Sequence, residues 1–121
     1  MPRVVHFEIA ADDPDRAVQF YSKVFGWEFN KWEGPQDYWL IKTGEQDEPG
    51  INGGLFRRGG PVDSVNTVDV PSLDEAMTRV TTNGGQVVAP KMAIPGVGYL
   101  AYCQDTEGNM FGMMEADQSA R

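Results

Sequence analysis

The sequence is poor in the residues that build disulfides, zinc sites and nucleic-acid interfaces. Its 121 residues include one cysteine and one histidine, and 18 acidic side chains outnumber 10 basic ones, for a formal charge of -8. The single cysteine, Cys103, excludes an internal disulfide and a cysteine-based zinc site, and it fits a reducing compartment. Because no basic stripe is available to neutralise phosphates, we expect no nucleic-acid partner.

Long apolar runs are also missing. The chain leads from Met1 directly into a short β-branched segment, without the apolar stretch of a signal peptide or a membrane span. We therefore expect no membrane partner and a cytoplasmic location. A composition of 40% hydrophobic and 23% charged residues is typical of a globular protein, and the length predicts one domain over residues 1–121.

The first half of the chain predicts one strand, one helix and three further strands. Polar and apolar residues alternate across residues 4–10, which indicates a strand. Asp13 suits the N-cap of a helix and Pro14 its first position, while Gly26 is placed to end it. The three following strands are expected at residues 27–32, 38–43 and 51–57.

The second half repeats this order. Residues 65–70 predict a strand, and Ser72 with Glu75 predicts a capping box in which each side chain satisfies a free amide at the helix start. Three more strands are expected at residues 86–89, 99–104 and 110–114. We interpret residues 94–99 as a flexible flap, and 105–109 as a hairpin loop with a positive φ at Gly108 or Asn109.

The two halves superpose when Gly26 is set on Gly85, and the same shift sets Ala17 on Ala76. Such a repeat predicts an α+β fold of two tandem βαβββ modules that form a half-barrel cleft. The first module is expected at about residues 1–58 and the second at about 62–116. Since small open sheets leave unpaired edges, we also expect a homodimer.

Two stretches carry a resemblance to a known family. One joins His6 on the first strand to the helix at 13–21 and its Phe25-Gly26 end, and the other is the closing hairpin at 105–112. Together they resemble the vicinal-oxygen-chelate family, which includes glyoxalase I, extradiol dioxygenases and bleomycin-resistance proteins. More narrowly, residues 7–9, 52–54 and 93–99 are similar to glyoxalase-like proteins of unassigned function.

The resemblance also implies where a metal would bind. In metal-dependent members four ligands project from equivalent strands, and the corresponding positions here are His6, Gly53, Val65 and Gly112. Only the histidine keeps a side-chain donor, whereas a divalent ion needs three or more protein ligands to be held firmly. We therefore expect no metal and no other cofactor. A divalent metal in a rebuilt site of His6, Glu8 and Asp69 is the alternative.

Glu8 is the candidate catalytic residue. It lies two positions from His6 on one strand face, where a partly desolvated carboxylate can act as a base or hold a cation. Without a functional role, Glu8 would be an exposed or arginine-paired carboxylate. His6 would then be a hydrogen-bonded residue of the cleft wall that has lost its role as a ligand. Aromatic residues on neighbouring strands would complete a small-molecule site. The predicted ligand-binding residues are His6, Glu8, Tyr38, Asp69, Tyr99 and Tyr102.

Three functions stay open on these grounds. The first is a metal-free protein that binds a small-molecule ligand, as in the bleomycin-resistance branch. The second is a metal-dependent lyase, isomerase or dioxygenase with a rebuilt site around His6 and Glu8. The third is a metal-free enzyme that moves a proton next to a carbonyl group. We rank binding first because the other two depend on so few residues.

Overall fold

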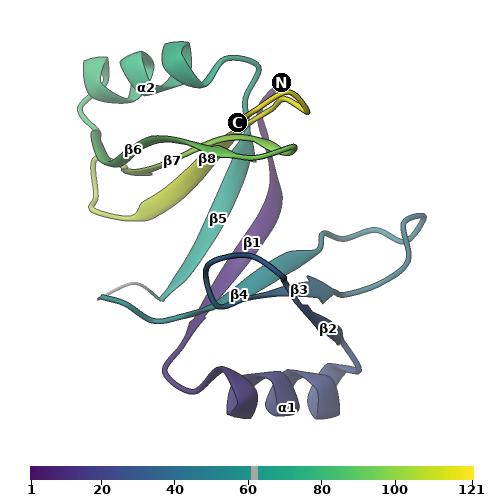
Figure 1. Cartoon of the computed structure of the whole chain (residues 1–121). Coiled ribbons are helices and arrows are strands. Elements are labelled where there is room, and N and C mark those ends of the chain that lie inside the picture. Colours follow the sequence, from purple (N-terminus) through teal and green to yellow (C-terminus); the bar gives the residue numbers. More distant parts are fainter. Residues whose placement is uncertain (61–62) are drawn as a thin grey trace. The chain divides into compact units, whose positions relative to one another are not determined.

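The computed structural model describes residues 1–60 and 63–121. The chain divides into two compact units, of which one comprises His6–Val65 and the other Met1–Val5 with Asn66–Arg121. We call them the first and second units. Each carries one helix and strands in the predicted βαβββ order, so the predicted fold class is confirmed (Figure 1). The expected start of the second module, position 62, lies outside the described residues.

The first unit packs one helix on one face of its sheet. The strand order is β2-β3-β4-β1, with β1 and β4 parallel and the other neighbours antiparallel. Asp13 caps the helix by accepting a hydrogen bond from the Arg16 amide, and Gly26 ends it at φ 74°, both as predicted. The elements are β1 (Arg3–Ala11), α1 (Pro14–Phe25), β2 (Glu28–Lys31), β3 (Tyr38–Lys42) and β4 (Gly53–Arg57).

The sheet of the first unit has two different faces because side chains alternate along each strand. The face toward α1 holds the core, formed by Ala11, Trp39, Ile41 and Leu55 with partly buried neighbours that include Phe7 and Ile9. The opposite face carries the alternate residues of β1, β3 and β4. We call it the helix-free face, and it is the face of His6, Glu8, Tyr38 and Gly54.

The second unit repeats the arrangement with strand order β5-β8-β7-β6, β5 and β8 being parallel. Its core consists of Val70, Leu73, Ala101, Cys103 and Met113. Cys103 is fully buried there, as expected of an apolar core residue. The elements are β5 (Ser64–Asp69), α2 (Leu73–Thr82), β6 (Gln86–Ile94), β7 (Gly98–Gln104) and β8 (Met110–Ala116).

The segment expected to be a flexible flap at 94–99 is a hydrogen-bonded hairpin turn. β6 runs on to Ile94, past Pro90, because it pairs only with β7 in the described residues and register shifts near Ala89 accommodate the proline. The turn is also tied to the C-terminal segment, since the Gly96 amide donates to the Ala120 carbonyl at 3.0 Å. Local sequence does not reveal this tertiary contact.

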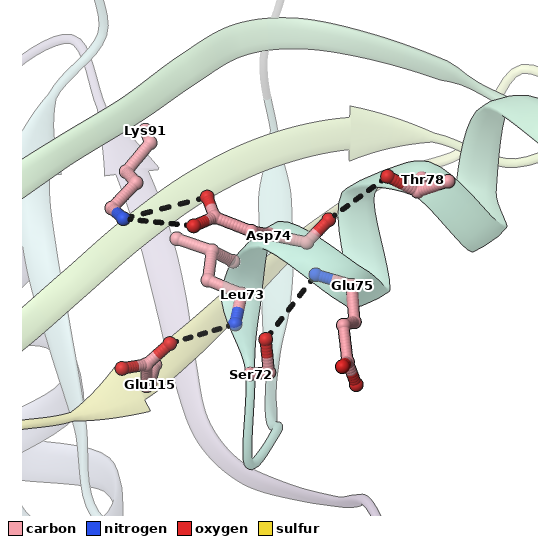
Figure 2. Close-up of polar contacts among 7 residues, drawn as sticks. All are labelled: Ser72, Leu73, Asp74, Glu75, Thr78, Lys91 and Glu115. Carbon is pink, nitrogen blue, oxygen red and sulfur yellow. Dashed lines mark hydrogen bonds and ion pairs between the residues drawn. The ribbon is translucent and has the colours of Figure 1, made fainter.

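The start of α2 keeps half of the predicted capping box. The Ser72 hydroxyl accepts a hydrogen bond from the Glu75 amide at 3.3 Å. In the described part of the chain, the Glu75 carboxylate does not return the bond. Instead Glu115, on β8, accepts a hydrogen bond from the Leu73 amide at 2.8 Å (Figure 2). The reciprocal half of the prediction is wrong, and a different free amide, that of Leu73, is satisfied by a carboxylate distant in sequence.

Neither helix of the described residues has the length and apolar character needed to cross a membrane.

Candidate functional site

Three polar side chains form a hydrogen-bonded chain on the helix-free face of the first unit. The Tyr38 hydroxyl lies 2.9 Å from His6 Nε2 and donates a hydrogen bond to Glu8 Oε2 at 2.8 Å. Glu8 is 7% exposed, while His6 and Tyr38 are half-buried. The structure thus brings together three of the predicted ligand-binding residues, including the candidate catalytic carboxylate.

The geometry of these hydrogen bonds depends on a glycine of β4, the strand that lies between β1 and β3. On β4, Gly54 pairs with Glu8 of β1 on one side and with Leu40 of β3 on the other. Tyr38 is two residues from Leu40, a diagonal position from which a long aromatic side chain can reach across. A Cβ atom on Gly54 would overlap the Tyr38 hydroxyl and ring. The bare backbone at Gly54 is therefore what lets Tyr38 reach His6 and Glu8.

The hydrogen bonds also define the proton positions. An ionised carboxylate only accepts hydrogen bonds, so the single Tyr38 proton goes to Glu8. His6 Nε2 must then be the donor to the Tyr38 oxygen. Burial lowers the pKa of His6, and the negative charge of Glu8 opposes this effect without cancelling it. At neutral pH His6 is therefore a neutral ring whose Nδ1 can accept a hydrogen bond or a proton.

An aromatic neighbour gives the site an apolar wall. The Trp32 ring stands edge-on to the Tyr38 ring, with 6.4 Å between the ring centroids. Trp32 is 37% exposed, so part of its surface is open to a ligand. The sequence indicated Trp32 only as one of several aromatic residues on the strands expected to line the cleft, and Gly54 only as part of the stretch 52–54. Side chains alternate along a strand, so Gly54 shares a face with Phe56, two residues further on. This alternation could have indicated on which face Gly54 lies.

One implied metal-ligand position needs correction. Gly53 lies on the face toward α1, where a Cβ atom would come within 2.5 Å of the Phe7 carbonyl oxygen. The residue beside Glu8 on the helix-free face is Gly54. In the second unit the corresponding pair is Thr67 and Gly112. The number of residues between the two paired positions therefore differs by one between the units. A comparison of the two halves at one constant shift could not reveal this difference.

The two other implied positions offer no donor. Val65, at the start of β5, is 2% exposed and apolar. Gly112, on β8, lies between Thr67 and Tyr102, and a Cβ atom there would be 3.1 Å from Thr67 Oγ1 and 3.4 Å from a ring carbon of Tyr102. Within either unit, as far as it is described, no three His, Cys, Asp or Glu side chains come together to hold an ion. The donor set thus does not fit a firmly held metal.

The remaining predicted ligand-binding residues belong to the second unit. Tyr99 packs against the core under α2, with Lys91 Nζ 4.7 Å from its ring centroid. Tyr99 and Tyr102 are three residues apart on one strand and so face opposite sides of the sheet. Their role in ligand binding stays a prediction. Asp69 is exposed and lines a hollow of about 340 Å³, together with residues that include Glu115 and Pro71. A rebuilt site of Asp69 with His6 and Glu8 stays a hypothesis.

Comparison with known protein sequences gives consistent matches. A family model described as "Bleomycin resistance protein-like N-terminal" matches residues 3–44. A glyoxylase-like domain-containing protein of Didymella fabae is 30% identical over 112 residues, which are 84% of this chain and 84% of that protein. "Putative glyoxylase CFP32" of Mycobacterium tuberculosis is 29% identical over 110 residues, or 89% of this chain. The chain spans only 42% of the length of that relative.

Solved structures with this fold include both uncharacterised proteins and enzymes. A hypothetical protein of Bacillus halodurans has a TM-score of 0.74 at 15% identity, with 99% of this chain and 98% of that chain covered. A methylmalonyl-CoA epimerase of Streptomyces coelicolor, in complex with 2-nitronate-propionyl-CoA, has a TM-score of 0.70 at 14% identity, with 98% and 97% covered. At such identities the likeness shows a shared fold alone.

Proposed function

The chain belongs to the vicinal-oxygen-chelate superfamily of glyoxalase and bleomycin-resistance proteins, and we propose that it binds a small organic molecule without a resident metal ion. The observation that carries this proposal is the His6–Tyr38–Glu8 chain on the helix-free face of the first unit. Small-molecule sites combine apolar walls with a few placed polar groups. Trp32 supplies such a wall here, and the three polar side chains supply the anchor.

The chemistry of the anchor indicates the class of ligand. Neutral His6 offers Nδ1 as an acceptor, and its neighbour Glu8 carries a negative charge. These groups favour a ligand that donates hydrogen bonds, such as an amine, amide or hydroxyl compound. The formal charge of -8 disfavours anions at the surface. We therefore propose a neutral or cationic ligand that carries hydrogen-bond donors.

Elemental analysis of the dialysed protein tests the metal-free part of the proposal. We expect far less than one ion of Zn, Ni, Fe or Mn per chain, and no rise in melting temperature when a metal chloride is added. A site that is not formed in the native state gives no linkage stabilisation. About one tightly held ion per chain, lost in the His6→Ala variant, would overturn the proposal and favour a metal-dependent enzyme.

A thermal-shift screen tests the location of the binding site. The probes are a panel of small amines, amides and hydroxy compounds, measured on the wild type and on Tyr38→Phe. Compounds bound at the anchor should raise the melting temperature of the wild type more than that of the variant. If every stabilising compound acted equally on both proteins, the site would lie elsewhere.

A second candidate function is metal-free proton transfer, as in a lyase or isomerase. The observation in its favour is that Tyr38 connects a neutral imidazole to a carboxylate, an arrangement able to accept a proton and pass it on. One structural neighbour is an epimerase whose bound ligand is a propionyl-CoA derivative, so propionyl-CoA is a reasonable first probe. Incorporation of deuterium next to its carbonyl, measured by NMR in D2O and lost in Glu8→Gln, would favour this enzyme.

A further inference from the structure

We propose that Tyr38 and Gly54 together replace a metal-binding carboxylate: the tyrosine occupies the space above the glycine, and its hydroxyl joins His6 to Glu8 where an ion would otherwise join them. This inference deepens the proposed function, on which it rests, because it concerns the same face of the sheet. It makes Tyr38 the residue that determines whether this face takes a hydrogen-bonded ligand or an ion.

The packing around Gly54 carries the first step. Gly54 lies beside Glu8 in the row where the metal-dependent members are expected to have a ligand. A Cβ atom at this position would overlap the Tyr38 hydroxyl and ring, so Gly54 and Tyr38 depend on each other. A carboxylate at position 54 and the present orientation of Tyr38 cannot coexist.

The second unit also has a glycine and a tyrosine near the equivalent position, in a different arrangement: Tyr102 pairs directly with Gly112, whereas Tyr38 reaches Gly54 diagonally. Gly112 pairs with Thr67 on one side and with Tyr102 on the other. A Cβ atom on Gly112 would be 3.4 Å from the Tyr102 ring and 3.1 Å from the hydroxyl of Thr67, which is 3% exposed. A glycine with a tyrosine on the adjacent antiparallel strand thus occurs in both units. Of these two glycines, only Gly54 lacks the space for a Cβ atom beside its tyrosine, because the contact of 3.4 Å with Tyr102 at Gly112 is an ordinary van der Waals distance, so the replacement is specific to the first unit.

The hydrogen bonds explain why the present arrangement excludes an ion. His6 Nε2 lies 2.9 Å from the Tyr38 hydroxyl and carries the proton of that bond. An ion at Nε2 would have to remove this proton and displace the hydroxyl, which also breaks the 2.8 Å bond to Glu8. Tyr38 therefore competes directly with a cation for the same nitrogen and the same carboxylate.

Restoring the carboxylate tests the inference. In the double variant Tyr38→Ala/Gly54→Glu, the introduced carboxylate shares the helix-free face with His6 and Glu8, and the tyrosine ring is gone. Calorimetric titration with NiCl2 or ZnCl2 alone should show binding at least tenfold tighter than in the wild type. Adding His6→Ala should abolish the gain. The single variant Gly54→Glu should show no gain, because the introduced side chain clashes with Tyr38 and cannot take its place beside His6 and Glu8.

A packing measurement keeps the test decisive if Gly54→Glu does not fold. Gly54→Ala should lower the melting temperature clearly in the wild type but little in the Tyr38→Ala background. Gly59→Ala is the control, because a Cβ atom there meets nothing within 4 Å. Equal losses for Gly54→Ala in both backgrounds would overturn the inference.

The metal titrations have two further outcomes against the inference. It is overturned if Gly54→Glu alone binds metal as tightly as the double variant, or if the folded double variant gains no metal binding. Failure of the proposed function alone has a different signature, namely that every stabilising compound of the thermal-shift panel acts equally on the wild type and on Tyr38→Phe. The two ideas can therefore fail separately.

Discussion

Replacing Tyr38 by phenylalanine removes one oxygen atom from the centre of the polar chain and leaves the ring above Gly54 in place. The variant loses the hydrogen bond to the Glu8 carboxylate and the one from His6. A hydrogen bond to a charged group contributes about 1.5–3 kcal/mol and a neutral one about 0.5–1.5 kcal/mol. Because Glu8 is only 7% exposed, water can replace the lost partner only in part. We expect a total loss of about 2–3 kcal/mol in the free energy of unfolding.

Urea denaturation at neutral pH measures this loss. The midpoint should fall while the dependence on urea concentration stays the same, since the surface exposed on unfolding hardly changes. For a chain of this length, 1 kcal/mol corresponds to about 3–5 °C in melting temperature. Thermal unfolding should therefore shift downward by roughly 6–15 °C.

The matched control is Tyr21→Phe. In the described residues, the Tyr21 hydroxyl makes no hydrogen bond. The Tyr21 ring stacks on the Trp27 ring, with 5.4 Å between the ring centroids. Removing that hydroxyl should change the free energy of unfolding by no more than about 0.5 kcal/mol. If Tyr38→Phe were as mild as this control, the polar chain would contribute nothing to stability and the reasoning would be refuted.

Three further predictions concern protonation, helix capping and assembly. His6 should titrate by NMR with a midpoint below 6.5, because burial lowers its pKa, and it is the only histidine in the chain. As the pH falls through the interval between 6.5 and the lower native midpoint, the unfolded state binds the proton first, so stability should decrease there. A midpoint at or above 6.5 would contradict this. Ser72→Ala should cost about 1 kcal/mol by removing the cap of α2, and an unchanged denaturation midpoint would count against it. We also propose a homodimer, which light scattering at micromolar concentration should detect; a monomer there would exclude it.

Much of the local structure follows from short-range patterns in the sequence. Alternation of polar and apolar residues identifies β1, and Asp13, Pro14 and Gly26 define the ends of α1 because capping involves only neighbouring backbone groups. The closing hairpin follows from Gly108, which has φ 84°. The repeat of these elements was sufficient to predict two βαβββ modules.

Only part of the candidate site could be predicted from short-range patterns in the sequence. His6 and Glu8 share a face because they are two residues apart on one strand, and this was predictable. The same rule places Tyr99 and Tyr102 on opposite faces of one strand, a distinction that grouping the aromatic residues by type did not make.

The sequence by itself determined the elements, their order, the family and the side of β1 on which the polar residues lie. Only the tertiary structure decided that Gly54, and not Gly53, stands beside Glu8, because the register between parallel strands depends on the whole connection between them. It also decided that Tyr38 closes the chain between His6 and Glu8. That contact joins residues far apart in the sequence, across a strand that has no side chain at Gly54, where Tyr38 passes over it.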